Sequence, residues 1–359
     1  MTLLANNTKA AMGRRRGTVS VPAVTLAHGG GGSAMRNLID DVFVTAFDNP
    51  SLDLLEDQAR FALADLARLG DRLAFTTDSY VVDPLFFPGG DIGKLAVCGT
   101  INDLAAGGAV PLYLTCSAII EEGLEVSTLR AVAKSMAAAA ADAGVQIVTG
   151  DTKVVHKGTC DKLFLNTAGV GIIREGVDLG ASRCRPGDTV LVNGLLGDHG
   201  AAILAARGDM ELAAAIASDC AALHGLVGDL LRAAPGTRFI RDATRGGLAT
   251  VLNEAARASN VSIRITEAAT PIREEVKAFC EILGLDPLYL ANEGKIVCVV
   301  PGNEEQAALE AMRAHPLGRH AAAIGRVTAN DPGRVVMDTV FGGQRIVDML
   351  VGDQLPRIC

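Results

Sequence analysis

The chain has 359 residues, of which 49% are hydrophobic and 21% are charged, and its formal net charge is −8 at pH 7. This composition argues against disorder, and the length predicts roughly two domains with packed cores. The acidic balance argues against a nucleic-acid binder, and no apolar run is long enough to predict a membrane span.

The first half of the chain alternates between predicted helices and strands. Three arginines at residues 14–16 lie in a segment without the apolar core of an export signal, so we expect a mobile basic arm at residues 1–22. An apolar run at 22–27 leads through the loop HGGGGS into a helix. The pattern predicts strands at residues 72–77, 112–120, 146–149 and 163–173, and helices at 93–106 and 126–143.

The second half shows the same alternation after a cluster of glycine, proline and charged residues at 174–188, which predicts a domain boundary. Strands are predicted at residues 189–193, 239–241, 262–266, 296–300, 323–328 and 335–337. Helices are predicted at residues 199–206, 210–233, 248–258, 272–283 and 304–314. We therefore expect an α/β fold with mixed sheets in two domains, 23–175 and 176–341, followed by a flexible tail at 342–359.

The tail ends on a cysteine, Cys359, which follows Pro356 closely. Chain ends are mobile unless they are tied down, and a proline prevents a helical ending. We interpret Cys359 as a reactive thiol on a flexible tail; the alternative is a frayed end without function.

The other cysteines form no CxxC pair, and the chain lacks a signal peptide, so reduced thiols in a cytoplasmic protein are expected. Five of them lie in apolar surroundings and are predicted core residues: Cys98, Cys116, Cys220, Cys280 and Cys298.

Four aspartates follow predicted elements and lie beside small or polar residues: Asp78, Asp103, Asp151 and Asp242. A single aspartate in such a place is usually a turn or cap residue. Four of them, accompanied by glycine-rich loops and a lysine, favour a site for Mg²⁺ and a nucleotide, because Mg²⁺ prefers carboxylate oxygens and bridges phosphates.

Candidate phosphate ligands lie in three places. The four glycines after His28 leave backbone N–H groups open to anionic oxygens, although a linker has the same composition and no P-loop motif is present. Lys94 lies at a predicted helix start, where the dipole favours anions. Lys153 follows Asp151 and either neutralises a transferring phosphoryl group or is an ordinary surface charge.

Two further motifs contain polar residues that suit a cleft. Glu293 in ANEGK is a candidate general base, with a plain turn as the alternative. The motif GDHG, with Asp198 and His199, predicts either a helix cap or polar groups that face a cleft.

Taken together, these motifs resemble the hydrogenase maturation carbamoyl dehydratase family, HypE, in the ATP-binding superfamily of aminoimidazole ribonucleotide synthetase. The resemblance covers residues 26–359 and rests on HGGGG, TTDSYVVDPLFFPGGDIGKLAVCGTINDLAAGGAVP, GDTKVV, GDHGA, DATRGGLA, ANEGK and the terminal PRIC. It implies two α/β domains per subunit, a homodimer formed through the N-terminal domains, and ATP with Mg²⁺ between the domains.

The resemblance also implies a reaction. A carbamoyltransferase of the HypF family would load a carboxamide onto Cys359, and ATP-dependent dehydration would convert it to an S-cyanate. Scaffold proteins of the HypC and HypD families would then accept the cyanide for the iron of a [NiFe]-hydrogenase.

Each of these roles is implied for particular residues. Cys359 would be the carrier, with Lys153 and Glu293 near its carboxamide. The metal carboxylates would be Asp78, Asp103, Asp151 and Asp242. The nucleotide would be lined or supported by His28, Gly29, Gly30, Gly31, Gly32, Asp83, Lys94, Asn102 and Thr152.

Two other functions stay open from the sequence. A sister enzyme that phosphorylates a small diffusible substrate would not need the terminal cysteine. A non-catalytic scaffold with a redox or metal-binding tail thiol would not bind ATP.

Overall fold

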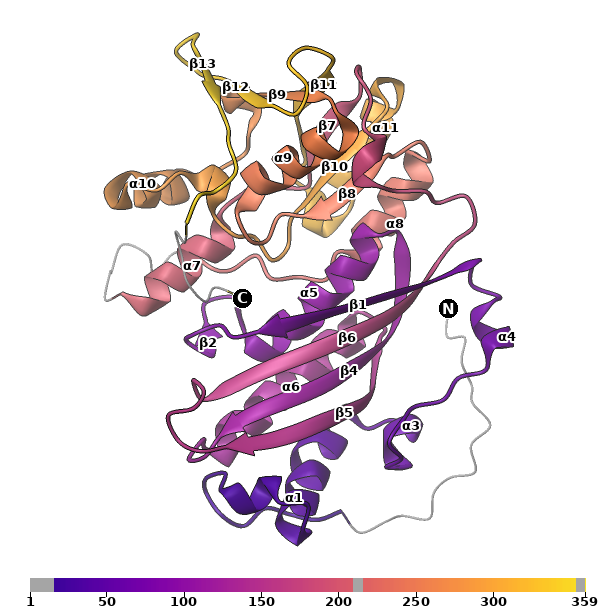
Figure 1. Cartoon of the computed structure of the whole chain (residues 1–359), viewed down its shortest axis with the longest axis vertical. Helices are drawn as coiled ribbons and strands as arrows, with labels where there is room; N and C mark the ends of the chain where they lie inside the picture. The colour runs from indigo at the N-terminus through magenta and orange to yellow at the C-terminus, as the bar shows by residue number, and fades with distance from the viewer. Residues whose placement is uncertain (1–15, 209–215, 353–358) are drawn as a thin grey trace.

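The structure, a computed structural model, describes residues 16–208, 216–352 and 359. Two α/β domains lie one above the other, and the C-terminus lies between them (Figure 1). This arrangement confirms the predicted fold class of mixed sheets in two domains.

The N-terminal domain is built on a four-stranded sheet in the order β1-β6-β4-β5. Its strands are β1 (Arg72–Tyr80), β4 (Ala109–Glu121), β5 (Gln146–Val155) and β6 (Leu163–Ile173). Only β4 and β5 pair in parallel. Helices α5 (Ile92–Ala106) and α6 (Val126–Asp142) cover one face, whereas the opposite face is turned to the viewer in Figure 1. The short strands β2 (Phe86–Phe87) and β3 (Gly90–Asp91) pair with each other.

Helix α5 packs closely because it has small residues at its contacts. Asp91 caps it by accepting hydrogen bonds from the backbone N–H groups of Gly93 and Lys94. A Cβ at Gly93 would lie 2.6 Å from the Val132 carbonyl on α6. One at Gly99 would lie 2.3 Å from the Tyr80 hydroxyl on β1. These glycines let α5 lie between the sheet and α6.

The C-terminal domain contains a seven-stranded sheet in the order β13-β12-β9-β11-β7-β10-β8. Its strands are β7 (Thr189–Val192), β8 (Phe239–Asp242), β9 (Ser262–Thr266), β10 (Ile296–Val300), β11 (Ala322–Thr328), β12 (Val335–Asp338) and β13 (Gln344–Ile346). Its helices are α7 (Asp198–Arg207), α8 (His224–Ala233), α9 (Gly247–Ser259), α10 (Glu274–Leu283) and α11 (Glu305–Ala314).

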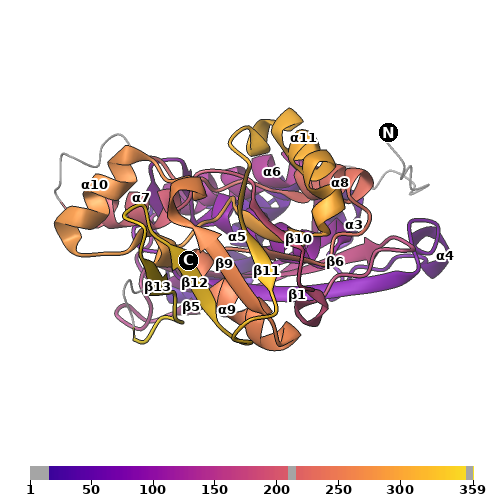
Figure 2. The same cartoon turned by 90° about the horizontal axis from the view of Figure 1, so that it is seen from above.

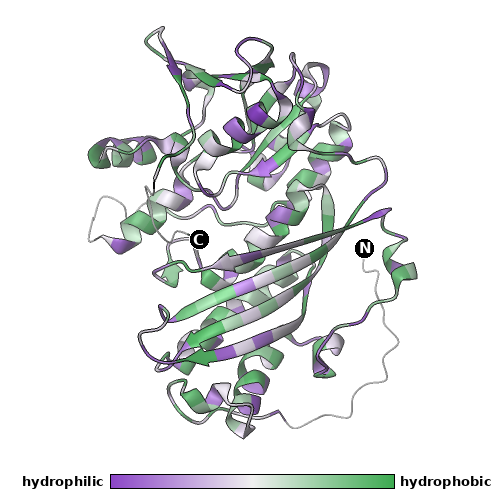
Figure 3. Ribbon diagram, viewed as in Figure 1, coloured by the Kyte–Doolittle hydropathy of each residue, from purple (hydrophilic) through white to green (hydrophobic). Residues whose placement is uncertain are grey.

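Strand β10 is buried on both faces. Ile296, Cys298 and Val300 belong to the core under α8 and α11, whereas Val297 and Val299 belong to the core under α9. Alternate side chains of a strand point to opposite faces, so β10 separates two cores. Figure 2 shows α8 and α11 on the side away from α9, and Figure 3 shows that the central strands are largely hydrophobic.

Short helices precede β1 in the N-terminal domain. They are α1 (Ser33–Leu38), the π-helix Ile39–Val44, α2 (Thr45–Phe47), α3 (Pro50–Asp53) and α4 (Leu63–Leu66). The backbone N–H groups of Gly17 and Val19 donate to Asp40 and Asp41. Residues 16–22 of the expected mobile arm are therefore bonded to the domain, and residues 1–15 lie outside the described part.

Three predicted elements differ from the structure. Strands β1 and β5 continue beyond their expected ends, so Asp78 and Asp151 lie within strands rather than after them. Both strands are sheet edges, where polar side chains are tolerated.

The predicted helix 210–233 is wrong in its described part, because only His224–Ala233 is helical and residues 216–223 are not. The start of the expected tail also differs: β13 pairs with β12, and Val347 is fully buried. In the parts of the chain that the structure describes, no helix is long and apolar enough to cross a membrane.

Candidate active site

The terminal cysteine lies at the end of β1, between the two domains. The backbone carbonyl of Cys359 accepts a hydrogen bond from the N–H of Val81 at 3.1 Å. Its half-buried side chain packs against the core of the N-terminal domain. Burial, and then the Glu293 carboxyl, raise the pKa of Cys359 to about 11, although Arg245 opposes this shift. The Glu293 carboxyl is therefore close enough to Cys359 to act on the charge of its thiol.

Glu293 is a buried carboxyl whose Oε1 atom has no hydrogen-bond partner among the described residues. The residue is 3% exposed, and no described group bonds its Oε1 atom. Burial raises the pKa of Glu293 well above its usual value, and the neighbouring Asp242 and Asp219 carboxylates add to the shift. A buried polar atom without a partner is costly, so this one points to a ligand or a reaction.

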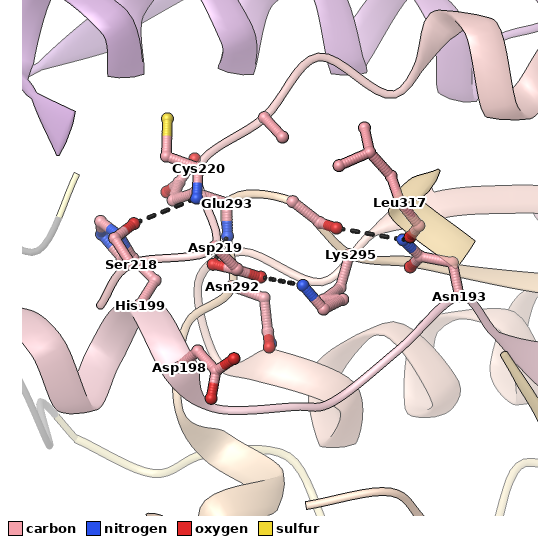
Figure 4. Close-up of polar contacts among 12 residues, drawn as sticks. Asn193, Asp198, His199, Ser218, Asp219, Cys220, Asn292, Glu293, Lys295 and Leu317 are labelled. Carbon is pink, nitrogen blue, oxygen red and sulfur yellow. Dashed lines mark hydrogen bonds and ion pairs between the residues drawn. The ribbon is translucent and has the colours of Figure 1, made fainter. Parts of the chain in front are cut away.

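The loop that holds Glu293 joins three of the motifs found in the sequence. Figure 4 shows its residues Asn292, Glu293 and Lys295, with Lys295 bonded to Asp219. The Asn292 side chain donates to the carbonyl of Ala243 at 2.8 Å and accepts from the N–H of Gly197 at 2.8 Å. These bonds connect ANEGK to DATRGG and to GDHG. Asn292 is 1% exposed, so the loop is fixed from within the protein.

A buried ion pair supports the same loop from the segment 216–223. Lys295 Nζ lies 2.8 Å from Asp219 Oδ2, and the N–H of Glu293 donates to Asp219 Oδ1 at 3.0 Å. Burial alone would raise the pKa of Asp219, but the attraction of Lys295 lowers it. Asp219 has no recognisable motif and lies in a region predicted as helix, so sequence reasoning missed it.

The residues of the GDHG motif are buried at the start of α7. His199 Nδ1 and the Ser218 hydroxyl are hydrogen-bonded at 2.8 Å, and the His199 ring meets the Phe87 ring edge-on at 5.6 Å. Asp198 accepts from Arg273 at 2.9 Å. Because Phe87 belongs to the N-terminal domain, this motif lies at the domain boundary.

Asn102 on α5 ties the two domains together. Its amide donates to the carbonyls of Ala221 at 3.0 Å and Glu293 at 3.1 Å, and its oxygen accepts from the N–H of Leu223 at 2.8 Å. The side chain is therefore committed to backbone groups, which differs from the nucleotide contact that the resemblance implied.

Three of the four predicted metal carboxylates gather at the domain boundary. Burial raises the pKa of Asp242 to about 7, and repulsion from Asp103 is the next cause. Burial likewise raises the pKa of Asp103, to which Asp78 adds, although Thr76 donates to it at 3.0 Å. Asp103 and Asp242 line a cavity of ≈ 450 Å³ between β1 and the C-terminal domain. Within residues 16–208, 216–352 and 359, no three Asp, Glu, His or Cys side chains are placed to hold a metal ion alone.

Asp151 is not part of this group in a single chain. It lies on β5, three strands away from Asp78 on β1, which is about 14 Å at the usual strand spacing. Asp78 is paired with the buried Thr167 on the helix-covered face, whereas Asp151 is paired with Ser117 on the open face. Lys153 binds Asp151 at 2.6 Å and therefore does not lie near Cys359, contrary to the prediction.

The glycine-rich loop lies at the same distant edge as Asp151. His28 is buried in a short 3-10 helix, Leu26–Gly29, and its Nδ1 accepts from the N–H of Thr25 at 2.9 Å. A Cβ at Gly29 would lie 3.0 Å from Val154 on β5. The loop residues Gly30, Gly31 and Gly32 and the buried Thr152 complete this second group.

The two remaining predicted residues lie apart from both groups. Lys94 Nζ donates to the carbonyl of Gly89 at 2.9 Å, and Asp83 pairs with Lys162 at 3.0 Å. Arg245, which we did not select from the sequence although it lies in DATRGG, approaches Asp78 at 3.8 Å.

Known proteins resemble this chain over nearly its whole length. Residues 56–173 match the family described as AIR synthase related protein, N-terminal domain, and residues 185–338 match the corresponding C-terminal domain. A protein of Rhodobacter capsulatus named carbamoyl dehydratase HypE is 61% identical over 336 residues, which cover 94% of this chain and 98% of that protein.

Two solved structures share the fold. A crystal structure described as hydrogenase maturation protein HypE in complex with ATP has a TM-score of 0.89 and 49% identity, and covers 93% of this chain and 99% of that one. A crystal structure of a HypE-HypF complex has a TM-score of 0.75 and 46% identity, and covers 89% of this chain and 100% of that one.

Proposed function

The chain belongs to the carbamoyl dehydratase HypE family, and we propose that it dehydrates a carboxamide carried on its own C-terminal cysteine, with ATP, to an S-cyanate. One observation carries this proposal: the terminal thiol lies between the domains, near the buried Glu293 carboxyl, whose Oε1 atom has no hydrogen-bond partner among the described residues. A chain end has no general reason to be held at such a place.

The chemistry converts a poor leaving group into a good one. The carboxamide oxygen attacks the γ-phosphorus of ATP, ADP leaves, and the oxygen becomes part of a phosphate ester. Loss of the two nitrogen protons and expulsion of phosphate with that oxygen then leave S–C≡N. The balance is one carboxamide and one ATP to one cyanate, one ADP and one phosphate. Positioning and charge stabilisation are enough for such a phosphoryl transfer.

Glu293 is our candidate for the group that accepts a nitrogen proton. Its side chain is buried beside the sulfur of Cys359, and its Oε1 has no other partner in the described structure. Burial raises its pKa well above the usual value, and repulsion from Asp242, Asp219 and Asp78 adds to the shift. Positive charge bound among these carboxylates lowers that pKa and prepares Glu293 to act as a base.

The boundary between the domains suits a nucleotide with Mg²⁺. The cavity of ≈ 450 Å³ has the size of an ordinary small-molecule site. Burial raises the pKa values of Asp103 and Asp242 there, and repulsion from neighbouring carboxylates adds to both shifts, which is the situation that a divalent cation relieves. Mg²⁺ commonly uses one or two carboxylates plus phosphate oxygens and water, and when bound it would neutralise phosphoryl charge.

We propose a homodimer formed through the open face of the N-terminal sheet. Leu73, Phe75 and Ile119 on this face are 61%, 70% and 42% exposed. Large apolar side chains that are exposed on one face of a sheet favour an interface with another chain. Asp151 and Lys153 lie on the same face, so a second copy packed there would bring them to a site that one chain leaves incomplete.

Mixing inactive variants tests this shared site. Lys153→Met and Glu293→Gln would each be inactive alone as homodimers. After subunit exchange, a mixed dimer would contain one site with an intact Lys153 from one subunit and an intact Glu293 from the other, so activity would return. Activity that does not return, with exchange verified by mass, would contradict a site shared between subunits.

The partners follow from the substrate. A carbamoyltransferase of the HypF family would load Cys359, and a structure related to this chain is described as a HypE-HypF complex. The S-cyanate would then pass its cyanide to the iron carried by scaffold proteins of the HypC and HypD families, for a [NiFe]-hydrogenase.

Mass spectrometry of the C-terminal peptide tests the central proposal. After incubation with the carbamoyltransferase, its substrates and ATP, the peptide should gain a carboxamide and then lose one water. Cys359→Ala should still bind ATP but show neither change, whereas Asp78→Asn should be loaded and not dehydrated. A Cys359→Ala variant with full nucleotide turnover on a diffusible substrate would instead support a sister kinase.

A further inference from the structure

Arg245 is held rigidly in the turn between β8 and α9. The next residues, Gly246 and Gly247, have left-handed φ angles of 70° and 56°. A Cβ at Gly246 would lie 2.1 Å from Thr250 Oγ1, and one at Gly247 would lie 2.5 Å from the carbonyl of Leu290. Only glycine fits both positions, so the turn fixes the direction in which Arg245 leaves the backbone.

The side chain of Arg245 reaches across the domain boundary to the tail. Its Nη2 lies 3.8 Å from Asp78 Oδ1 on β1, and its guanidinium is close enough to Cys359 to oppose the rise in the pKa of that thiol. The tail is also fixed at Val81, three residues beyond Asp78 on the chain. Arg245 therefore approaches Cys359 from the C-terminal domain, while the N-terminal domain holds the backbone of that residue.

Stability does not explain this placement. The Arg245 side chain is 73% exposed, and its distance to Asp78 is long for an ion pair. Exposed pairs of this kind contribute little to folding. A guanidinium has five N–H donors in a fixed plane, so donors remain after its approach to Asp78 and Cys359.

We propose that Arg245 is the positioning residue for the loaded tail, and that its guanidinium donates to the carboxamide oxygen on Cys359 and so holds that oxygen for phosphorylation. This inference rests on the proposed dehydration. The carboxamide oxygen is two bonds from the sulfur, whose charge Arg245 already stabilises. Dehydration removes this oxygen with the phosphate, so the product tail loses the contact and is released more easily.

The experiment compares wild type with Arg245→Ala and Arg245→Lys. The control is Arg264→Gln, which removes an exposed arginine paired with Asp338 in another part of the C-terminal sheet. At saturating ATP, we expect Arg245→Ala to form S-cyanate about 10- to 100-fold more slowly, the usual effect of a lost charge-assisted hydrogen bond. The KM for ATP should stay unchanged. Arg245→Lys should recover the rate only in part, and added ethylguanidinium should restore Arg245→Ala.

A second measurement uses the unloaded chain and does not depend on the dehydration. Because Arg245 holds the sulfur, the Arg245→Ala tail should leave its pocket more often, and Cys359 should be alkylated faster than in wild type. Unchanged alkylation together with a wild-type rate of S-cyanate formation would overturn the inference. If wild type forms no S-cyanate, the proposed function fails, and faster alkylation would still show that Arg245 holds the thiol.

Discussion

The two edges of the N-terminal sheet contain similar aspartates in opposite surroundings. At the β1 edge, Asp242 and Asp103 meet Asp78 at the domain boundary, and burial with mutual repulsion raises the pKa of Asp242 to about 7. At the β5 edge, Asp151 is 55% exposed, and its hydrogen bond with Lys153 lowers its pKa. The carboxyls at the β1 edge are buried and repel one another, whereas the carboxylate at the β5 edge is already paired with a lysine.

This difference shows which edge is prepared for chemistry within one chain. An exposed, paired carboxylate has no excess proton affinity to relieve, so a ligand gains little by binding it alone. Buried carboxylates without cations gain much from a metal ion or a proton. The terminal thiol and Glu293 lie at the β1 edge, where the buried carboxyls repel one another.

The largest effect should come from Glu293 at the β1 edge. We expect Glu293→Gln to slow S-cyanate formation by about 10²- to 10⁴-fold, because general acid–base groups contribute that much. The fold should be retained, since an amide has nearly the same shape as the neutral carboxyl. Single-turnover mass spectrometry of the C-terminal peptide measures the rate.

The matched control is Glu254→Gln, which removes a half-buried partner of Arg241. This variant should keep the wild-type rate. A Glu293→Gln enzyme as fast as the control would show that another group accepts the proton.

The next effect concerns the buried ion pair behind Glu293. Lys295 and Asp219 are 11% and 4% exposed, so Asp219→Asn leaves a buried ammonium without its counter-charge. We expect a loss of about 3–5 kcal/mol in the free energy of unfolding, measured by chemical denaturation. The double change Asp219→Asn with Lys295→Met should cost less than the sum of the single changes. Strict additivity would show that the two charges do not interact.

The sequence predicted most of the fold because its hydrophobic periods match the elements. Strands β9 and β10 have the predicted bounds, and alternate side chains of β10 belong to two different cores. The segment 216–223 was missed because its apolar and alanine-rich pattern is equally compatible with a helix. Its path is set by tertiary hydrogen bonds, such as that from Leu223 to Asn102, which local propensity does not describe.

The site was predicted less completely than the fold. The motifs identified Cys359 and Glu293, which lie together. They did not show that Asp151 lies apart from the other three aspartates, because the face of a sheet on which a side chain lies depends on strand length and register. Asp219 acts through burial and has no motif, so only the structure reveals it.

A smaller effect concerns the docked thiol at the β1 edge. With a pKa of about 11 in place of the ordinary 9.0, Cys359 has about 100-fold less thiolate at pH 8 than the same free tail peptide. Alkylation of the chain should be slower by about that factor. The docked state holds the proton more tightly, so docking is favoured below pH 9 and weakens as the pH rises towards 11. Peptide mapping of the alkylated residues separates Cys359 from the buried thiols, and equal rates for chain and peptide would mean that the tail is not docked.

The smallest effect on the free energy of unfolding is expected at the β5 edge. Lys153→Met removes an exposed partner of Asp151, so the free energy of unfolding should change by less than about 1 kcal/mol, in contrast to Asp219→Asn. The pKa of Asp151 is lowered by this lysine, so the pair stabilises the fold above the ordinary aspartate pKa and stops doing so as the pH falls through the lowered value. Denaturation at pH 7 and at pH 3 should therefore show a smaller difference between wild type and variant at the lower pH. A loss as large as that of Asp219→Asn would mean that the β5 edge is buried in the assembled protein, which would itself support the packing of a second copy against the open face.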